Sequence, residues 1–134
     1  MKLFYEVRET ITNIVKLIDI LVIISGCSAG KNASATTFKK KVEASYYADS
    51  FNGKKTASGE RFNNNKLTAA HRKLSFGTKV RVTNLANGKS VVVEITDRGP
   101  SKKSREIDMS RRAFMEISDS KNHGILMVKL EVLK

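Results

Sequence analysis

Asp97 is the residue of this chain that is best placed for acid–base chemistry. It follows the apolar run at residues 91–95, and Gly99 and Pro100 force a turn directly after it. A carboxylate at the end of a strand, on a constrained turn, is held rigidly at a surface, where proton-transfer groups are usually found. Aspartate also begins turns by bonding to its own backbone, so position alone favours a structural role. The other polar residues must decide between these two interpretations.

Glu60 and His71 are the other candidates for chemistry. Glu60 follows a glycine turn, and it could equally be a solvated loop carboxylate. His71 titrates near neutral pH and can orient a neighbouring carboxylate through a hydrogen bond, although a single histidine is more often structural. The second histidine, His123, has no comparable context and is interpreted as a surface residue.

Two arginines accompany these groups. Arg98 and Arg105 could bind a substrate carboxylate through paired hydrogen bonds. They could equally neutralise Asp97 or Asp108, and the sequence does not choose. An arginine directed at Asp97 would oppose proton donation by that carboxyl group, so the direction of the Arg98 side chain matters. Asp108 is interpreted as a helix cap rather than as a catalytic group.

The elements that must position these residues are mostly strands. Alternating apolar and polar residues predict strands at residues 42–48, 78–83, 90–96 and 125–133. Asn87 and Gly88 both tolerate positive φ, so they predict a tight hairpin turn between the second and third of these strands. Asp108 or Ser110 can cap one short helix that ends near residue 118. A mainly β chain with one helix indicates a small barrel or sandwich.

The N-terminal segment resembles an export signal. Residues 17–24 form an apolar run that is too short for a stable membrane anchor. Small residues follow it and lead to Cys27, the only cysteine. The pattern is similar to the lipobox of bacterial lipoproteins, in which the signal is cleaved before the cysteine and the thiol is acylated. Asp19, inside the apolar run, departs from that pattern, and a core cysteine after a short helix is the alternative.

This interpretation divides the chain into three parts. A lipoprotein signal peptide is expected at residues 1–26, a lipidated Cys27 with a flexible tether at residues 27–41, and one folded domain at residues 42–134. The protein is then exported and anchored to a membrane, facing the periplasm or cell wall, and Ser28 is compatible with the outer membrane. The formal net charge of +12 favours an anionic partner. The cell-wall glycan, with its carboxylate-bearing muramyl groups, is such a polymer.

Several motifs occur together in a fixed order. They comprise residues 44–47, 55–62, 67–71, 74–77, 81–88, 91–100 and 104–110. Together they resemble the rare lipoprotein A family, whose catalytic members are lytic transglycosylases. The resemblance covers nearly the whole of the expected domain. It implies a small six-stranded double-psi β-barrel with one short helix.

The resemblance also implies a reaction. A lytic transglycosylase cleaves the MurNAc–GlcNAc glycosidic bond of peptidoglycan by intramolecular attack and leaves a 1,6-anhydroMurNAc end. One carboxyl group can therefore donate a proton and then accept one. Carried over by position, Asp97 is the general acid/base, and Glu60 and His71 are catalytic residues of the same groove. The implied substrate-binding residues are Tyr46, Tyr47, Asn63, Thr68 and Arg98.

Two positions depart from the family pattern. Tyr46 stands where the family usually has tryptophan, and Asn63 stands where an aspartate of the groove is common. Tyrosine keeps a flat face for a sugar ring, whereas asparagine keeps the hydrogen bonds but loses the charge. A non-catalytic, expansin-like lipoprotein that binds peptidoglycan is therefore the alternative function.

The expected partners follow from export. They are peptidoglycan glycan strands, the membrane through the lipid on Cys27, and proteins of cell division or wall remodelling. A cytoplasmic basic domain that stacks nucleic-acid bases on Tyr46 and Tyr47 is the less favoured alternative, so no nucleic acid is expected. No metal or other cofactor is expected, because one cysteine and two distant histidines give no ligand spacing and no phosphate-binding loop is present.

Overall fold

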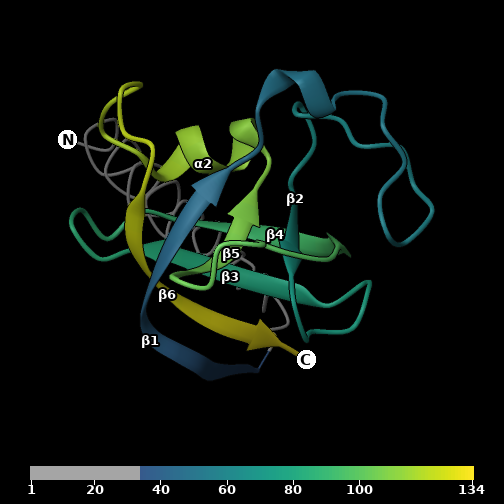
Figure 1. The fold of residues 1–134 in the computed structure, drawn as a ribbon. Coiled ribbons are helices and arrows are strands. Elements are labelled where there is room, and N and C mark those ends of the chain that lie inside the picture. Colours follow the sequence, from purple (N-terminus) through teal and green to yellow (C-terminus); the bar gives the residue numbers. More distant parts are fainter. Residues whose placement is uncertain (1–33) are drawn as a thin grey trace, which may run out of the picture. The chain divides into compact units, whose positions relative to one another are not determined.

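The computed structural model describes residues 34–134, and these residues form a closed six-stranded barrel in the order β1-β5-β2-β4-β3-β6 (Figure 1). Closure gives every strand a neighbour on each side, over at least part of its length. The prediction of a small mainly β barrel with one short helix is confirmed. The predicted signal peptide and Cys27 lie outside the described residues. Among residues 34–134, no helix is long and apolar enough to cross a membrane.

The strands have the following bounds: β1 Ala35–Tyr46, β2 Thr68–His71, β3 Lys79–Asn84, β4 Ser90–Asp97, β5 Arg105–Met109 and β6 Leu126–Leu133. A 3-10 turn spans Asp49–Phe51, and the helix α2 spans Arg111–Ile117. The four predicted strands correspond to β1, β3, β4 and β6, and the hairpin turn lies between β3 and β4, with Gly88 at φ 74°. Alternation does not predict β2 and β5, because four and five residues are too few to show a pattern.

β1 begins at Ala35, so the prediction of a flexible tether as far as residue 41 is wrong from that point. The side chains of this segment are exposed and mostly polar, which is why its composition suggests a tether. Its backbone nevertheless pairs with β6, from Ala35 opposite Leu133 to Lys39 opposite Leu130. Such pairing uses main-chain groups, so it needs no apolar side chains.

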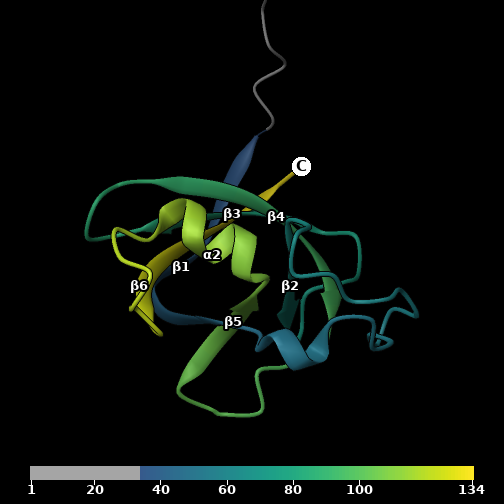
Figure 2. The same ribbon diagram turned by 90° about the horizontal axis from the view of Figure 1, so that it is seen from above.

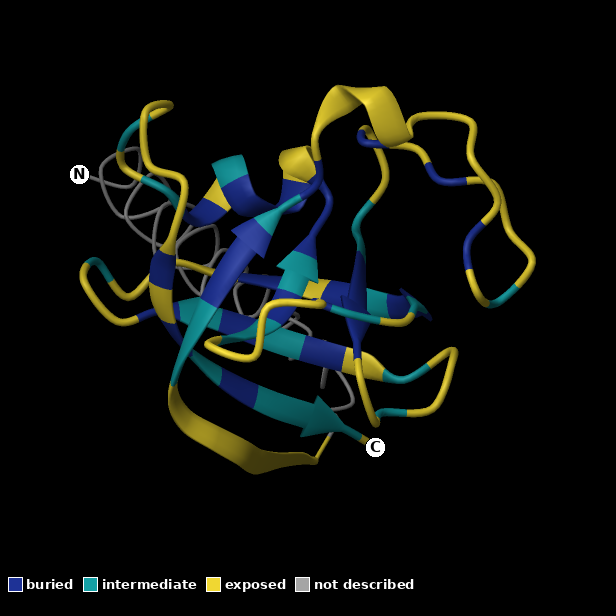
Figure 3. Ribbon diagram, in the orientation of Figure 1, coloured by how far each residue is buried: buried dark blue, intermediate teal, exposed yellow. Residues whose placement is uncertain are grey.

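The core lies inside the barrel, and buried residues alternate with more exposed ones along several strands (Figure 3). On β4, Val91, Val93 and Ile95 are buried, whereas Val92 is exposed. The helix α2 covers one end of the barrel (Figures 1 and 2). It buries Phe114 there, together with one alanine and one isoleucine. Alternate strand residues and the apolar face of the helix thus pack into the same core.

The helix is capped by Ser110 and not by Asp108. The Oγ atom of Ser110 accepts a hydrogen bond from the backbone N–H of Ala113, and the helix begins at Arg111. Asp108 lies two residues earlier, within β5. The interpretation of Asp108 as a cap is therefore wrong, because its backbone belongs to the barrel and its side chain is left for another role.

One feature of the pairing brings two acidic residues together. β2 lies between β4 and β5. It pairs with β4 in parallel and with β5 in the antiparallel direction. Ala70 of β2 is opposite Asp97 on one side and opposite Asp108 on the other. Directly paired residues project from the same face of a sheet. The two carboxyl groups therefore flank a methyl side chain on one surface of the barrel.

The assignment of inward and outward faces can be tested on neighbouring valines of β4. Val93 is 0% exposed and Val92 is 38% exposed. We expect Val93→Ala to lower the free energy of unfolding by about 2 kcal/mol, because it leaves a cavity in the core. Val92→Ala is the matched control and should cost less than about 1 kcal/mol. Denaturant unfolding measures both, and equal losses would contradict the assigned faces.

Candidate active site

Asp97 lies in a groove with a cavity of about 320 Å³. The groove is formed by the end of β1 and the segment after it, by the turn that follows β4, and by β5. Gly99 occupies that turn with φ 132°, a conformation that other residues rarely adopt, as the Gly-Pro pattern indicates. The residues that line the groove are Tyr46, Tyr47, Ala48, Phe51, Asp97, Arg98, Gly99, Pro100, Ser101, Arg105 and Asp108.

The carboxylate of Asp97 accepts three hydrogen bonds. The hydroxyl of Tyr47 donates to Oδ2 over 2.6 Å. The backbone N–H groups of Ala57 and Arg98 donate to Oδ1 over 2.9 Å and 2.8 Å. Donors from three separate segments of the chain therefore fix the orientation of this half-buried side chain. A carboxylate held in this way has a defined position from which it can exchange a proton with a substrate.

Tyr47 is held in place by aromatic packing. Its ring lies 4.3 Å from that of Phe62 and 5.4 Å from that of Phe51, measured between centroids. Burial raises the pKa of Tyr47 far above its ordinary value, and the hydrogen bond to Asp97 raises it further. The phenol therefore stays protonated, and it acts as a donor to Asp97 at any physiological pH.

The guanidinium of Arg98 points away from Asp97. Its Nη1 atom donates to the carbonyl oxygens of His71 and Leu74, over 3.2 Å and 2.9 Å. Its carbon Cζ also lies 3.9 Å from the centroid of the Phe76 ring, a cation–π geometry. The question that the sequence leaves open for Arg98 is answered, because this arginine fixes the turn after Asp97 and does not form an ion pair with it.

Asp108 is the functional candidate that the sequence interpretation misses. It lines the same groove, and its Oδ1 accepts a hydrogen bond from the buried Ser45 hydroxyl over 2.7 Å. Burial raises the pKa of Asp108 above its ordinary value. The negative charge of Asp97 also raises that pKa, while the Ser45 hydrogen bond and Arg105 work against the shift. The groove therefore holds a second carboxyl group, which keeps its proton to a higher pH than an ordinary aspartate does.

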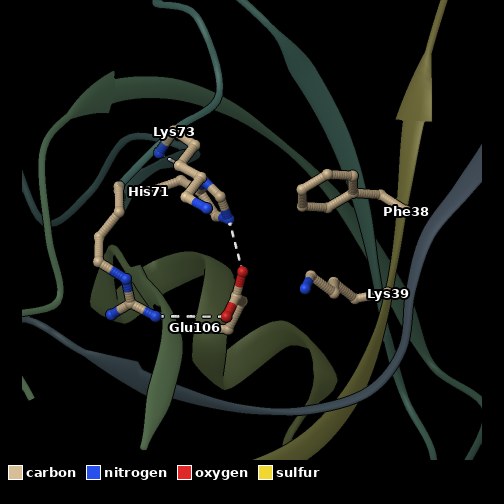
Figure 4. A pocket seen from close by; sticks show the side chains of 6 residues that line it. Phe38, Lys39, His71, Lys73 and Glu106 are labelled. Atoms are coloured by element: carbon tan, nitrogen blue, oxygen red, sulfur yellow. Dashed lines mark hydrogen bonds and ion pairs between the residues drawn. The ribbon is translucent and has the colours of Figure 1, made fainter. Parts of the chain in front are cut away.

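His71 lies in a different cavity, of about 360 Å³, which Figure 4 shows. Its ring is 1% exposed and points toward Glu106, with Nε2 3.0 Å from Oε1. Its Nδ1 accepts from the backbone N–H groups of Lys73 and Leu74, so the ring proton is on Nε2 and is donated to Glu106. Burial lowers the pKa of His71, and the hydrogen bond to Glu106 opposes that shift. The ring makes no contact with Asp97 among the hydrogen bonds of residues 34–134.

Arg72 links this second cavity to the groove. Its Nη2 lies 3.3 Å from Oε2 of Glu106. Its Nη1 donates to the carbonyl oxygens of Pro100 and Arg105, over 2.9 Å and 2.8 Å. Arg72, just after β2, thus binds main-chain oxygens of the turn after β4 and of β5, and Arg98, in the turn after β4, binds main-chain oxygens at the end of β2 and in the turn that follows it. These hydrogen bonds stabilise the wall of the groove.

The remaining predicted site residues are placed apart from one another. Glu60 is exposed, on the loop whose Ala57 N–H binds Asp97. Asn63 is also exposed and lines a separate cavity, where it accepts from its neighbour Asn65. Thr68 is half-buried in β2, and its carbonyl oxygen accepts from the N–H of Ser110. None of these residues lines the groove, so only some of the expected residues converge.

Tyr46 and Tyr47 both line the groove, as does Arg98. The ring of Tyr46 packs against Phe114, with 4.7 Å between centroids, and its remaining surface faces the groove. Within the described part of the chain, no group of three or more His, Cys, Asp or Glu residues is arranged to hold a metal ion. The chemical groups that line the groove are two carboxyl groups that can transfer protons, a tyrosine donor and an aromatic wall.

Comparison with known proteins identifies the family of this chain. Residues 39–130 match the family described as lytic transglycolase. A "Probable endolytic peptidoglycan transglycosylase RlpA" of Treponema pallidum is 56% identical over 87 residues, which are 65% of this chain and 27% of that protein. The "Endolytic peptidoglycan transglycosylase RlpA" of Rickettsia felis is 51% identical over 106 residues, 77% of this chain and 46% of that protein. The chain thus spans less than half the length of these curated relatives.

Solved structures share the fold at low sequence identity. A Streptomyces papain inhibitor superposes with a TM-score of 0.58 at 20% identity, covering 74% of this chain and 96% of the inhibitor. The apo expansin of Clavibacter michiganensis superposes with a TM-score of 0.57 at 20% identity, covering 72% of this chain and 51% of the expansin. A variant of that expansin is also known in complex with cellohexaose. The expected expansin-like, double-psi barrel is confirmed, and the chain belongs to the lytic transglycolase family, in the rare lipoprotein A group that its motifs indicate.

Proposed function

We propose that this domain is a lytic transglycosylase that cleaves the MurNAc–GlcNAc bonds of peptidoglycan glycan strands. The observation that supports the proposal most directly is the pair of carboxyl groups, Asp97 and Asp108, which line one groove and each accept hydrogen bonds from other segments of the chain. The named activity of the relatives supports the same reaction. Asp97 is the residue that the motifs single out, and Asp108 adds a partner that a single-carboxyl mechanism lacks.

The reaction requires one proton to leave the attacking group and one to reach the leaving group. The C6 hydroxyl of the muramyl sugar attacks its own C1 atom, so a bond from C1 to that oxygen forms as the bond from C1 to the glycosidic oxygen breaks. Because the nucleophile belongs to the same sugar, proximity can supply roughly 7–11 kcal/mol in well-oriented cases. No water is consumed, and the product carries a 1,6-anhydro ring.

In this proposal the two protons are handled by different groups. Asp97, which accepts hydrogen bonds from three donors, takes the proton of the C6 hydroxyl. Asp108, whose pKa is raised by burial, gives its proton to the departing oxygen. The exchange leaves Asp97 protonated and Asp108 ionised, and one proton returned between them through the groove restores the enzyme. Two carboxyl groups in different roles are the usual arrangement for cleaving glycosidic bonds.

The other expected residues have supporting roles in the proposal. Tyr46 offers an aromatic face to a sugar ring, and Tyr47 orients Asp97. His71 is a positioning residue, because it fixes the turn whose carbonyl oxygens hold Arg98, the residue after Asp97. Glu60, exposed on the loop that binds Asp97, stabilises the positive charge that develops on the sugar ring. Asn63 and Thr68 lie outside the groove and are assigned to more distant sugars of the strand.

A domain that acts on the cell wall must be exported, and the proposal includes the route. Cleavage before Cys27 and acylation of its thiol would anchor the protein to a membrane, in an outer membrane where the cell has one. Proteins of division or wall remodelling would be its neighbours there. These proposals rest on the sequence pattern, since Cys27 lies outside the described residues.

The alternative is a domain that binds glycan without cutting it. It is favoured by the shared fold of an expansin, of which a cellohexaose complex is known. The alternative predicts that wall material is retained but that no anhydro ends appear. The assay described next separates the two functions.

Asp97→Asn is expected to reduce the formation of 1,6-anhydro ends by about 100-fold or more, because it removes a proton acceptor. Asparagine can still accept the two backbone hydrogen bonds, so the fold should persist. Mass spectrometry of purified glycan strands after digestion measures the ends. Asp119→Asn is the matched control, since Asp119 forms an exposed ion pair with Lys89 outside the groove. Equal product from wild type and Asp97→Asn would remove Asp97 from the chemistry.

Asp108→Asn is expected to change activity and stability in opposite directions. Loss of the acid should lower the rate by about 100-fold or more. The raised pKa means that the folded chain resists ionisation of Asp108, so at neutral pH this residue lowers stability relative to an uncharged one. The melting temperature of Asp108→Asn should therefore exceed that of wild type near neutral pH, and the gain should shrink as the pH falls toward the ordinary pKa of aspartate. A loss of stability at neutral pH would argue against a buried, strained acid.

Tyr47→Phe is expected to lower kcat by about 10-fold or more with little change in KM. The substitution keeps the packing against Phe51 and Phe62 but removes the hydroxyl that orients Asp97. A hydrogen bond to a charged group contributes about 1.5–3 kcal/mol. Steady-state kinetics on glycan strands measure the effect, and Asp119→Asn, whose ion pair with Lys89 lies outside the groove, is again the control. An effect on KM alone would assign Tyr47 to substrate binding.

A further inference from the structure

Arg105 differs from every other arginine of the described domain. Residues 34–134 contain seven arginines, and six of them use their guanidinium groups in ion pairs or in hydrogen bonds to carbonyl oxygens. These six are Arg61, Arg72, Arg81, Arg98, Arg111 and Arg112. No hydrogen bond or ion pair within the described residues uses the guanidinium of Arg105. Its Nε atom is buried and has no partner.

The unpaired guanidinium lies in the groove of Asp97 and Asp108. Its backbone is fixed, because its N–H donates to Lys102 and its carbonyl oxygen accepts from Arg72. Glu43 is its partner in the register of β1 and β5, yet no ion pair joins the two side chains. A buried N–H without an acceptor is costly. The Nη groups of Arg105 also have no partner among residues 34–134 and are not buried, so they are the donors that a ligand in the groove can reach.

We infer that Arg105 binds a carboxylate of the glycan strand beside the bond that is cleaved. The inference rests on the function proposed above and adds the chemical group that the groove recognises. A guanidinium has a planar fork of donors that matches a carboxylate, and it is the side chain best suited to recognise one. Arg98 is less suited to this role, because its Nη1 atom is bound to two carbonyl oxygens and its guanidinium lies over the ring of Phe76.

Only the muramyl sugars of the strand carry carboxylates. The lactyl group of MurNAc ends in a free carboxylate when no peptide is attached, and the stem peptide supplies carboxylates when it is present. GlcNAc carries none. Arg105 therefore sets the register of the strand, because it places a muramyl sugar, rather than GlcNAc, next to Asp97 and Asp108.

Binding there would also act on the acid. The positive charge of Arg105 favours ionised Asp108, and a carboxylate bound to the guanidinium adds a negative charge nearby. The bound substrate thus shifts Asp108 toward its protonated form at the moment when a proton must be donated. A carboxylate-free glycan would lack this effect.

The test measures binding, so that it does not depend on cleavage. The full chain carrying Asp97→Asn, with Arg105 intact or as Arg105→Gln, is titrated calorimetrically with four ligands. They are peptide-free muramyl strands, the same strands with their lactyl carboxylates converted to methylamides, strands that keep their stem peptides, and chito-oligosaccharides of equal length. Arg112→Gln is the matched control, because Arg112 pairs with Glu116 on α2 and does not line the groove.

With Arg105 intact, methylamide formation should weaken binding of peptide-free strands by about 10-fold or more. Arg105→Gln should weaken binding of unmodified strands by a similar factor, with no further loss on methylamides and none on chito-oligosaccharides. If only strands with stem peptides show the effect of Arg105→Gln, the peptide is the source of the carboxylate and the inference still holds.

The inference is overturned by any of three results. The first is that the chain with Arg105 intact binds free and methylamide peptide-free strands equally, while Arg105→Gln has no effect on peptide-bearing strands. The second is that Arg105→Gln weakens binding of all four ligands by the same factor. The third is that Arg112→Gln has the same effect as Arg105→Gln. The comparison of free with methylamide strands uses the chain with Arg105 intact, so that part of the test remains informative should Arg105→Gln fail to fold. Catalysis that persists in Asp97→Asn would contradict the proposed mechanism without touching these affinities, so the two failures are distinguishable.

Discussion

The pairing of β2 with both β4 and β5 is the constraint on which the site depends. It sets Asp97 and Asp108, from strands that are not sequence neighbours of β2, on either side of Ala70. The methyl group of Ala70 leaves space between them that a larger side chain would fill. Neither acid needs a long or flexible side chain to reach the other, because backbone hydrogen bonds fix their separation. A one-residue slip in either pairing would turn one of the acids to the opposite face of the sheet.

In a strongly basic chain, a cation close to these acids would lower their pKa and oppose proton donation. The formal net charge is +12, and arginines precede or follow the site in sequence. Arg98 and Arg72 are directed to main-chain oxygens instead, where they hold the turns that form the wall of the groove. The guanidinium groups of these two arginines therefore stabilise the turns and do not form ion pairs with the acids. The positive surface remains available to attract an anionic polymer over longer distances.

The local part of this architecture is predictable from the sequence, and the non-local part is not. Alternation predicts β3, β4 and β6, the Asn87–Gly88 turn predicts a hairpin, and the Gly-Pro turn marks Asp97 as a rigidly held carboxylate. Each of these signals lies within a few neighbouring residues. The start of β1 is missed, because exposed polar side chains hide a backbone that pairs with β6.

Asp108 and the surroundings of His71 depend on partners far away in the chain. Asp108 is within reach of a plausible helix start, so local reasoning assigns it to a cap, yet β5 pairs it with a residue 38 positions earlier, Ala70. His71 matches a motif, but its ring is directed by Glu106 and by the backbone of its own turn. No local pattern encodes which way such side chains point, since packing between distant segments decides it.

Two features of the groove are locally unfavourable, and their coincidence is informative. Asp108 is an acid whose ionised form is opposed by burial, and Arg105 has an N–H that no acceptor satisfies. A core optimised for stability would replace the first with an amide and would pair the second. Both features lie in the one cavity that holds Asp97, while the other arginines of the described domain are all partnered. Unfavourable groups concentrated at one place in an otherwise satisfied fold indicate that a ligand, and not the fold, accounts for them.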